Sequence, residues 1–227
     1  MKKPLIVLCC LIGIVISTQA QSLILKAGGS LANVGSIIET KNKPGIVAGL
    51  AFEIPLSSRF SIQPELLFHQ KGFKEDGSLE ESDPYQTYFV DFKSSFTLNY
   101  LELPVLVKYK FGIFYVNGGS SISYGIGGKY SLSPDGGSTL KGKMKFGHNS
   151  TTLSNEDTDF YIENALDLGL QVGGGVKIFK RIIIDARYGF GLSSPYDKND
   201  MVSFKKDKSH NRSFQLTLGY PIKLGKR

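Results

Sequence analysis

Histidine, cysteine and tryptophan are scarce in this chain of 227 residues. It has no tryptophan, three histidines and two cysteines, and both Cys9 and Cys10 lie close to the N-terminus. Histidine and cysteine metal sites need closely spaced ligands or convergent carboxylates, whereas His69, His148 and His210 are far apart in the sequence. The sequence therefore predicts no bound metal and no cofactor.

Long apolar runs are also absent, apart from one at the N-terminus. Two lysines precede an uncharged apolar run from Leu5 to Ile16, and Thr18-Gln19-Ala20 supplies the small residues that a signal peptidase accepts. This run is shorter than the roughly 20 residues that a membrane-spanning helix needs. We therefore expect residues 1–20 to be a cleaved signal peptide that removes both cysteines, and residues 21–227 to form one domain. Leu8 stands before Cys9 where a lipoprotein signal has a small residue, which argues against a lipid anchor.

The rest of the chain has no apolar stripe of helical period. Instead, short segments alternate apolar with polar or small residues, which is the pattern of a strand with one face in an apolar medium. The eight segments are Leu23–Leu31, Ile46–Ile54, Phe60–Lys71, Tyr100–Tyr109, Phe114–Ile126, Leu166–Ile178, Ile182–Leu192 and Ser213–Ile222. Their lengths suit tilted strands that cross a bilayer, which need about 9 to 11 residues. Pro64 cannot donate to a strand ladder, so we expect a bulge or an unpaired position there.

The breaks between these segments are alternately short and long. The short ones lie around Ser57-Ser58, Phe111-Gly112 and Phe179-Lys180, and the long ones are Asn33–Gly45, Gly72–Thr97, Gly128–Phe160 and Ser193–Arg212. This rhythm predicts an all-β fold, namely an eight-stranded antiparallel up-and-down transmembrane β-barrel of a Gram-negative outer membrane. An even number of strands places both termini on the side of the short turns. We expect that side to be periplasmic and the four long loops to be extracellular.

Charged residues occupy the strand face opposite the apolar one. The inward set predicted from the alternation comprises Lys26, Lys71, Lys108, Lys177, Arg187, Glu53, Glu65, Glu102, Asp167 and Asp185. The interior of an eight-stranded barrel is just filled by side chains, and buried charges are costly unless they are paired. We therefore predict a plugged barrel with a lumen charge network and no open pore. Catalysis is the competing interpretation of the inward carboxylates.

The charge pattern also bears on partners. The formal net charge is +7, and Lys2 and Lys3 of the expected signal peptide contribute two of the positive charges. Many basic residues alternate with acidic ones, whereas a nucleic-acid site gathers basic residues on one face, so we expect no nucleic-acid partner. Tyrosines and phenylalanines near the segment ends are typical of the belts at a lipid–water interface. The second long connection is mostly acidic and the fourth mostly basic. We expect contacts with outer-membrane lipid, lipopolysaccharide and envelope proteins, or only solvated loops.

Two other interpretations stay open at this point. A membrane-embedded lipid-modifying hydrolase or protease needs a histidine within hydrogen-bond distance of a serine and a carboxylate at the barrel rim. A soluble lipocalin-like barrel would place its apolar residues inside and its polar residues outside. The G-x-x-x-x-G-K sequence from Gly137 to Lys143 has Met144 where a phosphate-binding loop has serine or threonine, so we interpret it as a coincidence in a surface loop.

Several motifs resemble the PorT-like outer-membrane β-barrel family. They are Lys26–Gly29, Gly49–Leu56, the Q-P-E-L-L-F…K-G motif from Gln63 to Gly72 and the N-Y-L-E-L-P motif from Asn99 to Pro104, followed by a glycine-rich fifth strand. The resemblance covers essentially the whole chain after the expected signal peptide. It implies an eight-stranded, surface-exposed barrel and carries no catalytic assignment, and the family's namesake is linked to secretion and gliding machinery.

These expectations describe a non-enzymatic integral outer-membrane protein. Its loops would serve binding, assembly or envelope integrity. The alternative is a subunit of an envelope protein-secretion machinery, and a membrane-embedded hydrolase is the remaining enzyme hypothesis.

Overall fold

The computed structural model describes residues 22–35, 40–82, 87–147, 159–162, 164–179, 181–193 and 210–223. The expected signal peptide, His148 and most of the fourth long loop lie outside these residues. Within the described ranges the regular secondary structure is entirely β. In this part of the chain, no helix is long and apolar enough to cross a membrane.

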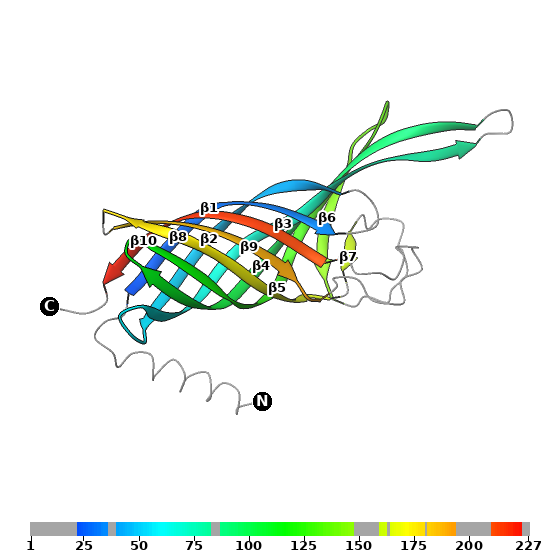
Figure 1. The fold of residues 1–227 in the computed structure, drawn as a ribbon. Helices are drawn as coiled ribbons and strands as arrows, with labels where there is room; N and C mark the ends of the chain where they lie inside the picture. Colours follow the sequence, from blue (N-terminus) through cyan, green and yellow to red (C-terminus); the bar gives the residue numbers. More distant parts are fainter. Residues whose placement is uncertain are drawn as a thin grey trace, which may run out of the picture.

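Eight long strands close into a ring, as Figure 1 shows. They are β1 (Ser22–Gly35), β2 (Thr40–Pro55), β3 (Phe60–Ser82), β4 (Thr87–Phe111), β5 (Phe114–Pro134), β8 (Leu166–Ile178), β9 (Ile182–Gly191) and β10 (His210–Lys223). The order β4-β3-β2-β1-β10-β9-β8-β5 is closed by pairing between β4 and β5, and every neighbouring pair in the ring is antiparallel. The predicted eight-stranded antiparallel barrel is therefore confirmed.

The two faces of the wall have opposite chemistry. Outward side chains are apolar and exposed, for example Val172 at 57%, Leu218 at 59% and Leu103 at 50% relative accessibility. Inward side chains are largely polar or charged and buried, for example Lys26 and Glu65. A soluble barrel buries its apolar set, so the lipocalin-like interpretation is wrong.

Glycines allow the strands of this narrow ring to approach closely. A Cβ added to Gly28 would lie 2.1 Å from the carbonyl oxygen of Leu216 on β10, and one added to Gly119 would lie 2.0 Å from that of Val105 on β4. Both distances are far below van der Waals contact, so neither position accepts a larger residue without a shift of backbone. Glycine at these two positions is therefore required by the close approach of the neighbouring strands.

Short connections and both described ends of the chain lie at one end of the barrel. Ser22 pairs with Lys223, the strands β2 and β3 are separated only by residues 56–59, and Phe111 pairs with Phe114 across the β4–β5 turn. This arrangement agrees with the prediction that the termini share the side of the short turns.

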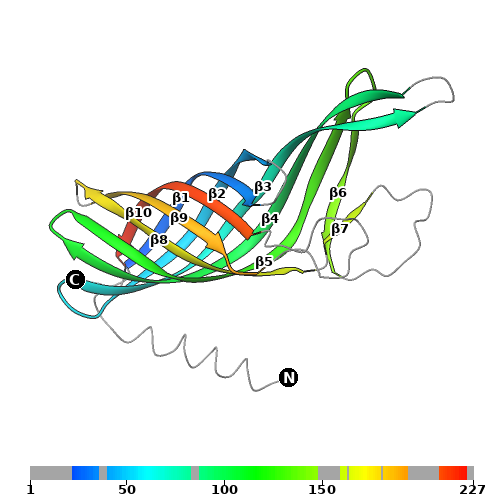
Figure 2. The same cartoon turned by 45° about the vertical axis from the view of Figure 1, so that its right-hand side comes forward.

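At the opposite end, the described parts of the first three expected loops are largely strand, which corrects the sequence interpretation. The strands β3, β4 and β5 contain 23, 25 and 21 residues, about twice what a bilayer crossing requires. Beyond β5 the chain adds β6 (Leu140–Phe146), antiparallel to β5, and the short β7 (Phe160–Ile162), parallel to β6. Figure 2 shows the β3–β4 and β5–β6 hairpins projecting past the other strands. A hairpin outside the lipid is held by hydrogen bonds between its backbones and does not need one apolar face. These segments therefore lack the strict apolar alternation on which the prediction relied.

Pro64 lies at an unpaired position of the β2–β3 ladder, which is one of the two expected outcomes, and it does not produce a bulge. The register between β2 and β3 is the same on both sides of it, with Ile54 opposite Ile62 and Ala51 opposite Glu65, and the ladder is only interrupted between these pairs. Register shifts occur elsewhere, between Asn42 and Val47 of β2 and at Asn99/Tyr100 of β4. Both shifts lie where the strands begin to extend beyond the barrel.

Candidate functional site: the interior charge network

The central part of the barrel interior holds four charged side chains from three strands. The guanidinium of Arg187 on β9 donates two hydrogen bonds to Glu65 on β3, Nη1 to Oε2 at 2.7 Å and Nη2 to Oε1 at 2.8 Å. Lys26 Nζ on β1 lies 3.3 Å from Glu65 Oε1 and 3.2 Å from Asp185 Oδ1. Arg187 Nε also lies 2.6 Å from Asp185 Oδ1. Two cations and two anions thus form a neutral cluster that joins opposite walls of the barrel.

Neutral polar side chains complete the surroundings of these carboxylates. Tyr115 Oη donates to Asp185 Oδ2 at 2.5 Å, and Asn117 Nδ2 donates to the same oxygen at 3.1 Å. Gln63 donates to Glu65. A buried carboxylate is tolerated when its oxygens are hydrogen-bonded, and these three residues supply such bonds. The alternation placed all three on the inward face, but their partners depend on the register across the ring.

A second cluster is centred on Lys71 of β3. Its Nζ lies 3.1 Å from Asp167 Oδ2 on β8 and 3.6 Å from Glu102 Oε1 on β4. Glu102 is additionally held by His69 Nδ1 at 2.8 Å and accepts hydrogen bonds from Ser123 and Gln171. Asn211 on β10 donates to Asp167 at 2.9 Å. The sequence analysis named Lys71, Glu102 and Asp167, and the structure adds His69 as a fourth member.

A third, smaller group lies nearer the short-turn end. Lys108 Nζ is 3.3 Å from Glu53 Oε2, and Lys110 also pairs with Glu53. Lys108 lies over the ring of Tyr115, 4.2 Å from its centroid, in a cation–π contact. Glu53 is only partly buried, so this group marks the edge of the network where water reaches the wall.

Lys177 does not belong to the network, contrary to the prediction. Lys177 is exposed, whereas Lys26, Lys71 and Lys108 are buried and form ion pairs. Lys177 pairs with Ile183 at the end of β8, one residue before the β8–β9 turn. At the mouth of a barrel the inward-facing position is open to water, so the ammonium group needs no protein partner there. Lys110 contributes a cation that the sequence analysis did not include.

Two clusters of buried apolar side chains accompany the charged interior. One consists of Ile24, Ala51, Tyr115 and Ile183, and the other of Leu98, Tyr100, Met144 and Ile162, with the ring of Phe146 packed against it. A cavity beside Lys71, Glu102 and Asp167 measures about 10 Å³, which is about the space of one water molecule. Ionised groups in such surroundings have little water to solvate them, so they depend on one another.

The histidines do not form a nucleophilic site among the described residues. His69 is fully buried, uses Nδ1 to contact Glu102, and has no hydrogen-bond partner for Nε2. Ser123 donates to Glu102 and not to His69. His210 lies at the start of β10, and its Nδ1 also has no partner. No group of three or more His, Cys, Asp or Glu side chains in the described ranges is arranged to hold a metal ion.

The fold resembles that of several solved outer-membrane proteins at low sequence identity. A comparison with curated proteins gave no significant match. Among solved structures, Ail of Yersinia pestis is 15% identical, with 90% of this chain and 100% of that chain covered and a TM-score of 0.43. Neisserial surface protein A is 13% identical, with coverages of 89% and 97% and a TM-score of 0.46. The protease OmpT of Escherichia coli is 10% identical, with coverages of 89% and 95% and a TM-score of 0.39.

A family model described as an outer membrane protein beta-barrel domain matches residues 15–197, which is most of the chain. This match includes every strand of the ring except β10. The chain therefore belongs to the outer membrane protein beta-barrel domain family and is a protein of the outer membrane.

Proposed function

We propose that this protein is a non-enzymatic barrel with a closed lumen, whose extended strands serve as a binding or assembly surface outside the membrane. The observation that carries the closed lumen is the Arg187–Glu65 pair, which spans the interior from β9 to β3 with two hydrogen bonds of 2.7 and 2.8 Å. Lys26 and Asp185 fill the remaining space beside it. An ion that crossed the barrel would have to separate these pairs.

The absence of an assembled nucleophile among the described residues supports the non-enzymatic role. Catalytic serine chemistry requires a histidine that accepts the serine proton, and His69 faces a carboxylate while its other nitrogen is enclosed. The charges of the interior have partners that stabilise the fold, which is the usual role of such groups in narrow barrels. We assign the ten predicted lumen residues, without Lys177 and with His69 and Lys110, to this structural role.

Among the described residues, the projecting hairpins extend beyond the barrel and offer a surface to partners. We propose that they lie on the extracellular side, that both termini are periplasmic, and that residues 1–20 are the cleaved signal peptide. Outer-membrane lipid, lipopolysaccharide and envelope proteins are the proposed partners. The roles open to such a surface are binding, assembly and envelope integrity.

Electrical conductance tests the closed lumen directly. We expect the folded protein in a planar lipid bilayer to give no steady ion conductance. Replacing Lys26, Glu65, Asp185 and Arg187 together with alanine keeps the net charge and empties the centre, so this variant should conduct if it folds. A stable, ohmic current through the unmodified protein would refute the proposal, whether or not the variant folds.

Membership of a secretion machinery is a second proposed role, because two motifs resemble the PorT-like family. The motifs Gln63–Gly72 and Asn99–Pro104 lie on paired strands and contribute Glu65, His69, Lys71 and Glu102 to the interior. Their residues therefore have a structural explanation that is independent of secretion. Purification from native membranes under mild detergent tests this role: copurified secretion components would support it, and their absence at stoichiometric yield would count against it.

A further inference from the structure

The outer wall of the barrel carries a group of lysines just beyond the apolar band. Strand register identifies this face. Leu98 of β4 pairs with the inward residue Lys71, so its neighbour Thr97 points outward, together with its own partners Gly72 and Lys129. The same alternation places Ser95, Lys74, Ser131 and Lys141 on the outer face, and Lys143 follows as the partner of Lys129.

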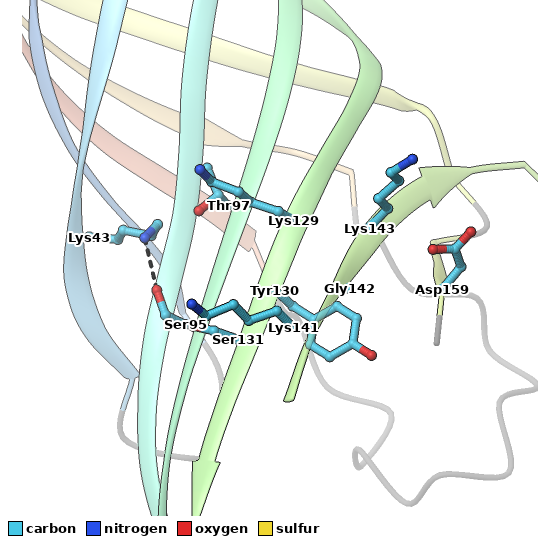
Figure 3. Close-up of a pocket in the computed structure, with 10 residues that line it drawn as sticks. All are labelled: Lys43, Ser95, Thr97, Lys129, Tyr130, Ser131, Lys141, Gly142, Lys143 and Asp159. Atoms are coloured by element: carbon cyan, nitrogen blue, oxygen red, sulfur yellow. Dashed lines mark hydrogen bonds between the residues drawn. The ribbon is translucent and has the colours of Figure 1, made fainter. Parts of the chain in front are cut away.

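A groove of about 620 Å³ lies on this wall, and Figure 3 shows the residues that line it. Its lining includes Lys43, Lys129, Lys141 and Lys143, and the hydroxyl groups of Ser95, Thr97 and Ser131 lie between the lysines. Lys43 Nζ donates a hydrogen bond to Ser95 Oγ at 2.8 Å, which draws this side chain from β2 onto the neighbouring strands. The groove therefore combines ammonium groups with neutral hydroxyl groups, a donor-rich set that suits phosphate oxygens.

Among the described residues that line the groove, four lysines face a single carboxylate, Asp159, which lies close enough to Lys143 to interact with it electrostatically. Lys129 and Lys143 are directly opposite each other on β5 and β6, an arrangement of like charges that destabilises a sheet. Asp159 is the one carboxylate in the lining, and it pairs with Lys145. Burial, and the positive charges of Lys74 and Lys129, lower the pKa of Lys43. An anion bound here would relieve this repulsion.

The height of the groove on the wall matches the level of lipid headgroups. On β5, the outward residues Ile122, Tyr124 and Ile126 are 48%, 57% and 55% exposed, as expected for side chains in contact with acyl chains. Lys129 follows Ile126 after three residues, a rise of roughly 10 Å along the strand. On the neighbouring β4, outward-facing Leu101 and Leu103 are likewise exposed below Thr97. Acyl chains against this band would bring their headgroup to the lysines.

We propose that this outer-wall groove binds the phosphorylated sugar headgroup of a glycolipid in the outer leaflet, that is, the bisphosphorylated glucosamine disaccharide of lipopolysaccharide. The proposal rests on the proposed orientation, with the projecting hairpins outside the cell. Phosphate oxygens accept hydrogen bonds from Lys43, Lys129 and Lys143, and the acyl chains pack on the apolar residues below. The interaction is electrostatic at an exposed surface, so it weakens as the salt concentration rises.

Lipid binding to the folded protein in detergent tests the proposal. The probes are bisphosphorylated lipid A, the same lipid after enzymatic removal of both phosphates, and a soluble bisphosphorylated glucosamine disaccharide without acyl chains. The test variant combines Lys43→Gln, Lys129→Gln and Lys143→Gln. The matched control combines Arg59→Gln, Lys177→Gln and Arg181→Gln, which removes the same number of positive charges from exposed residues at the other end of the barrel.

We expect the unmodified protein and the control to prefer bisphosphorylated lipid A to both other probes. The test variant should lose about tenfold in affinity for it, the effect of removing three exposed charge pairs of modest strength. Without lipid, the test variant should unfold at the same temperature as the unmodified protein or higher, because the repulsion between Lys129 and Lys143 is gone. This readout separates loss of binding from loss of folding.

Three results would overturn the inference. The first is equal affinity of the test variant and the unmodified protein for bisphosphorylated lipid A. The second is equal affinity of the unmodified protein for the phosphorylated and dephosphorylated lipids. The third is binding of the soluble disaccharide as tightly as the lipid, which would assign the groove to soluble anions. Because binding is measured in detergent, these results do not depend on the conductance experiment or on membership of a secretion machinery.

Discussion

Replacement of Glu65 by glutamine removes one charge from the centre of the barrel while it nearly preserves the shape of the side chain. Glu65 accepts two hydrogen bonds from Arg187 and pairs with Lys26, and its side chain has no exposed surface. After the substitution, two cations face Asp185 alone. The four-residue cluster changes from neutral to singly positive in a region that water does not reach.

The expected loss of stability is large because both partners are also enclosed. The side chains of Arg187 and Lys26 are 1% and 3% exposed, so neither can turn toward water to recover its solvation. Removing one partner from a buried ion pair costs about 3 to 5 kcal/mol in the free energy of unfolding. A glutamine amide still accepts one hydrogen bond from Arg187, so we expect a value near the lower end of that range.

Urea unfolding of the protein in lipid vesicles measures this change. The chain has no tryptophan, so circular dichroism and the gel mobility of the folded barrel are the appropriate signals. The variant Asp76→Asn is the matched control, because it removes a carboxylate from the exposed Lys41–Asp76 pair and should have a much smaller effect. The double variant Glu65→Gln with Lys26→Met restores neutrality and should recover about half of the loss.

The reasoning fails if Glu65→Gln unfolds at the same urea concentration as the Asp76→Asn control. It also fails if the double variant is less stable than Glu65→Gln alone, since unbalanced charge would then not be the cause. Either outcome would show that the interior is solvated enough for an unpaired cation.

Three further predictions concern the glycines, Lys177 and the exposed Lys41–Asp76 pair. Gly28→Ala places a methyl group against the backbone of β10 and should lower the free energy of unfolding by about 1 to 3 kcal/mol in the same urea assay. Gly29→Ala is its control and should be nearly neutral, because the nearest atom to the added methyl group is 3.8 Å away. Lys177→Gln should change the free energy of unfolding by less than about 0.5 kcal/mol, because the side chain is exposed. A loss of stability as large as that of Glu65→Gln would show that Lys177 belongs to the interior charge network. The hydrogen bond from Lys41 lowers the pKa of Asp76, so this pair contributes at pH values above the ordinary aspartate pKa and its contribution is lost as the pH falls through the lowered value. NMR titration should therefore find a higher pKa for Asp76 in a Lys41→Gln variant, and an unchanged pKa would contradict the pairing.

The alternation of side chains was sufficient to predict much of the wall. Residues two apart on a strand share a face, so the alternation within Tyr100–Tyr109 places Leu103, Val105 and Val107 on the apolar face, and these residues are exposed in the structure. The same rule placed Lys26, Glu65 and Arg187 inside. The same rule gives Lys177 an inward-facing position, but it cannot tell that this position lies at the end of the barrel, where the side chain is exposed.

The projecting strands were missed for a related reason. Neither face of a hairpin that projects beyond the membrane contacts lipid. Residues 73–96 and 128–146 therefore show no strict alternation of apolar and polar side chains, and their composition resembles that of loops. The lysine groove depends on these strands and on the register shift at Asn99/Tyr100. Neither could be read from local sequence.

The amino-acid sequence by itself determined the strand period, the apolar outer face and the charges of the interior, because each of these depends on neighbours along one strand. Only the tertiary structure decided which charges meet, that His69 joins Glu102, and that lysines of β2, β5 and β6 surround one groove. Those contacts depend on strand register and on closure of the ring. A shift of one residue between two strands leaves the sequence pattern unchanged but moves every side chain to a different partner.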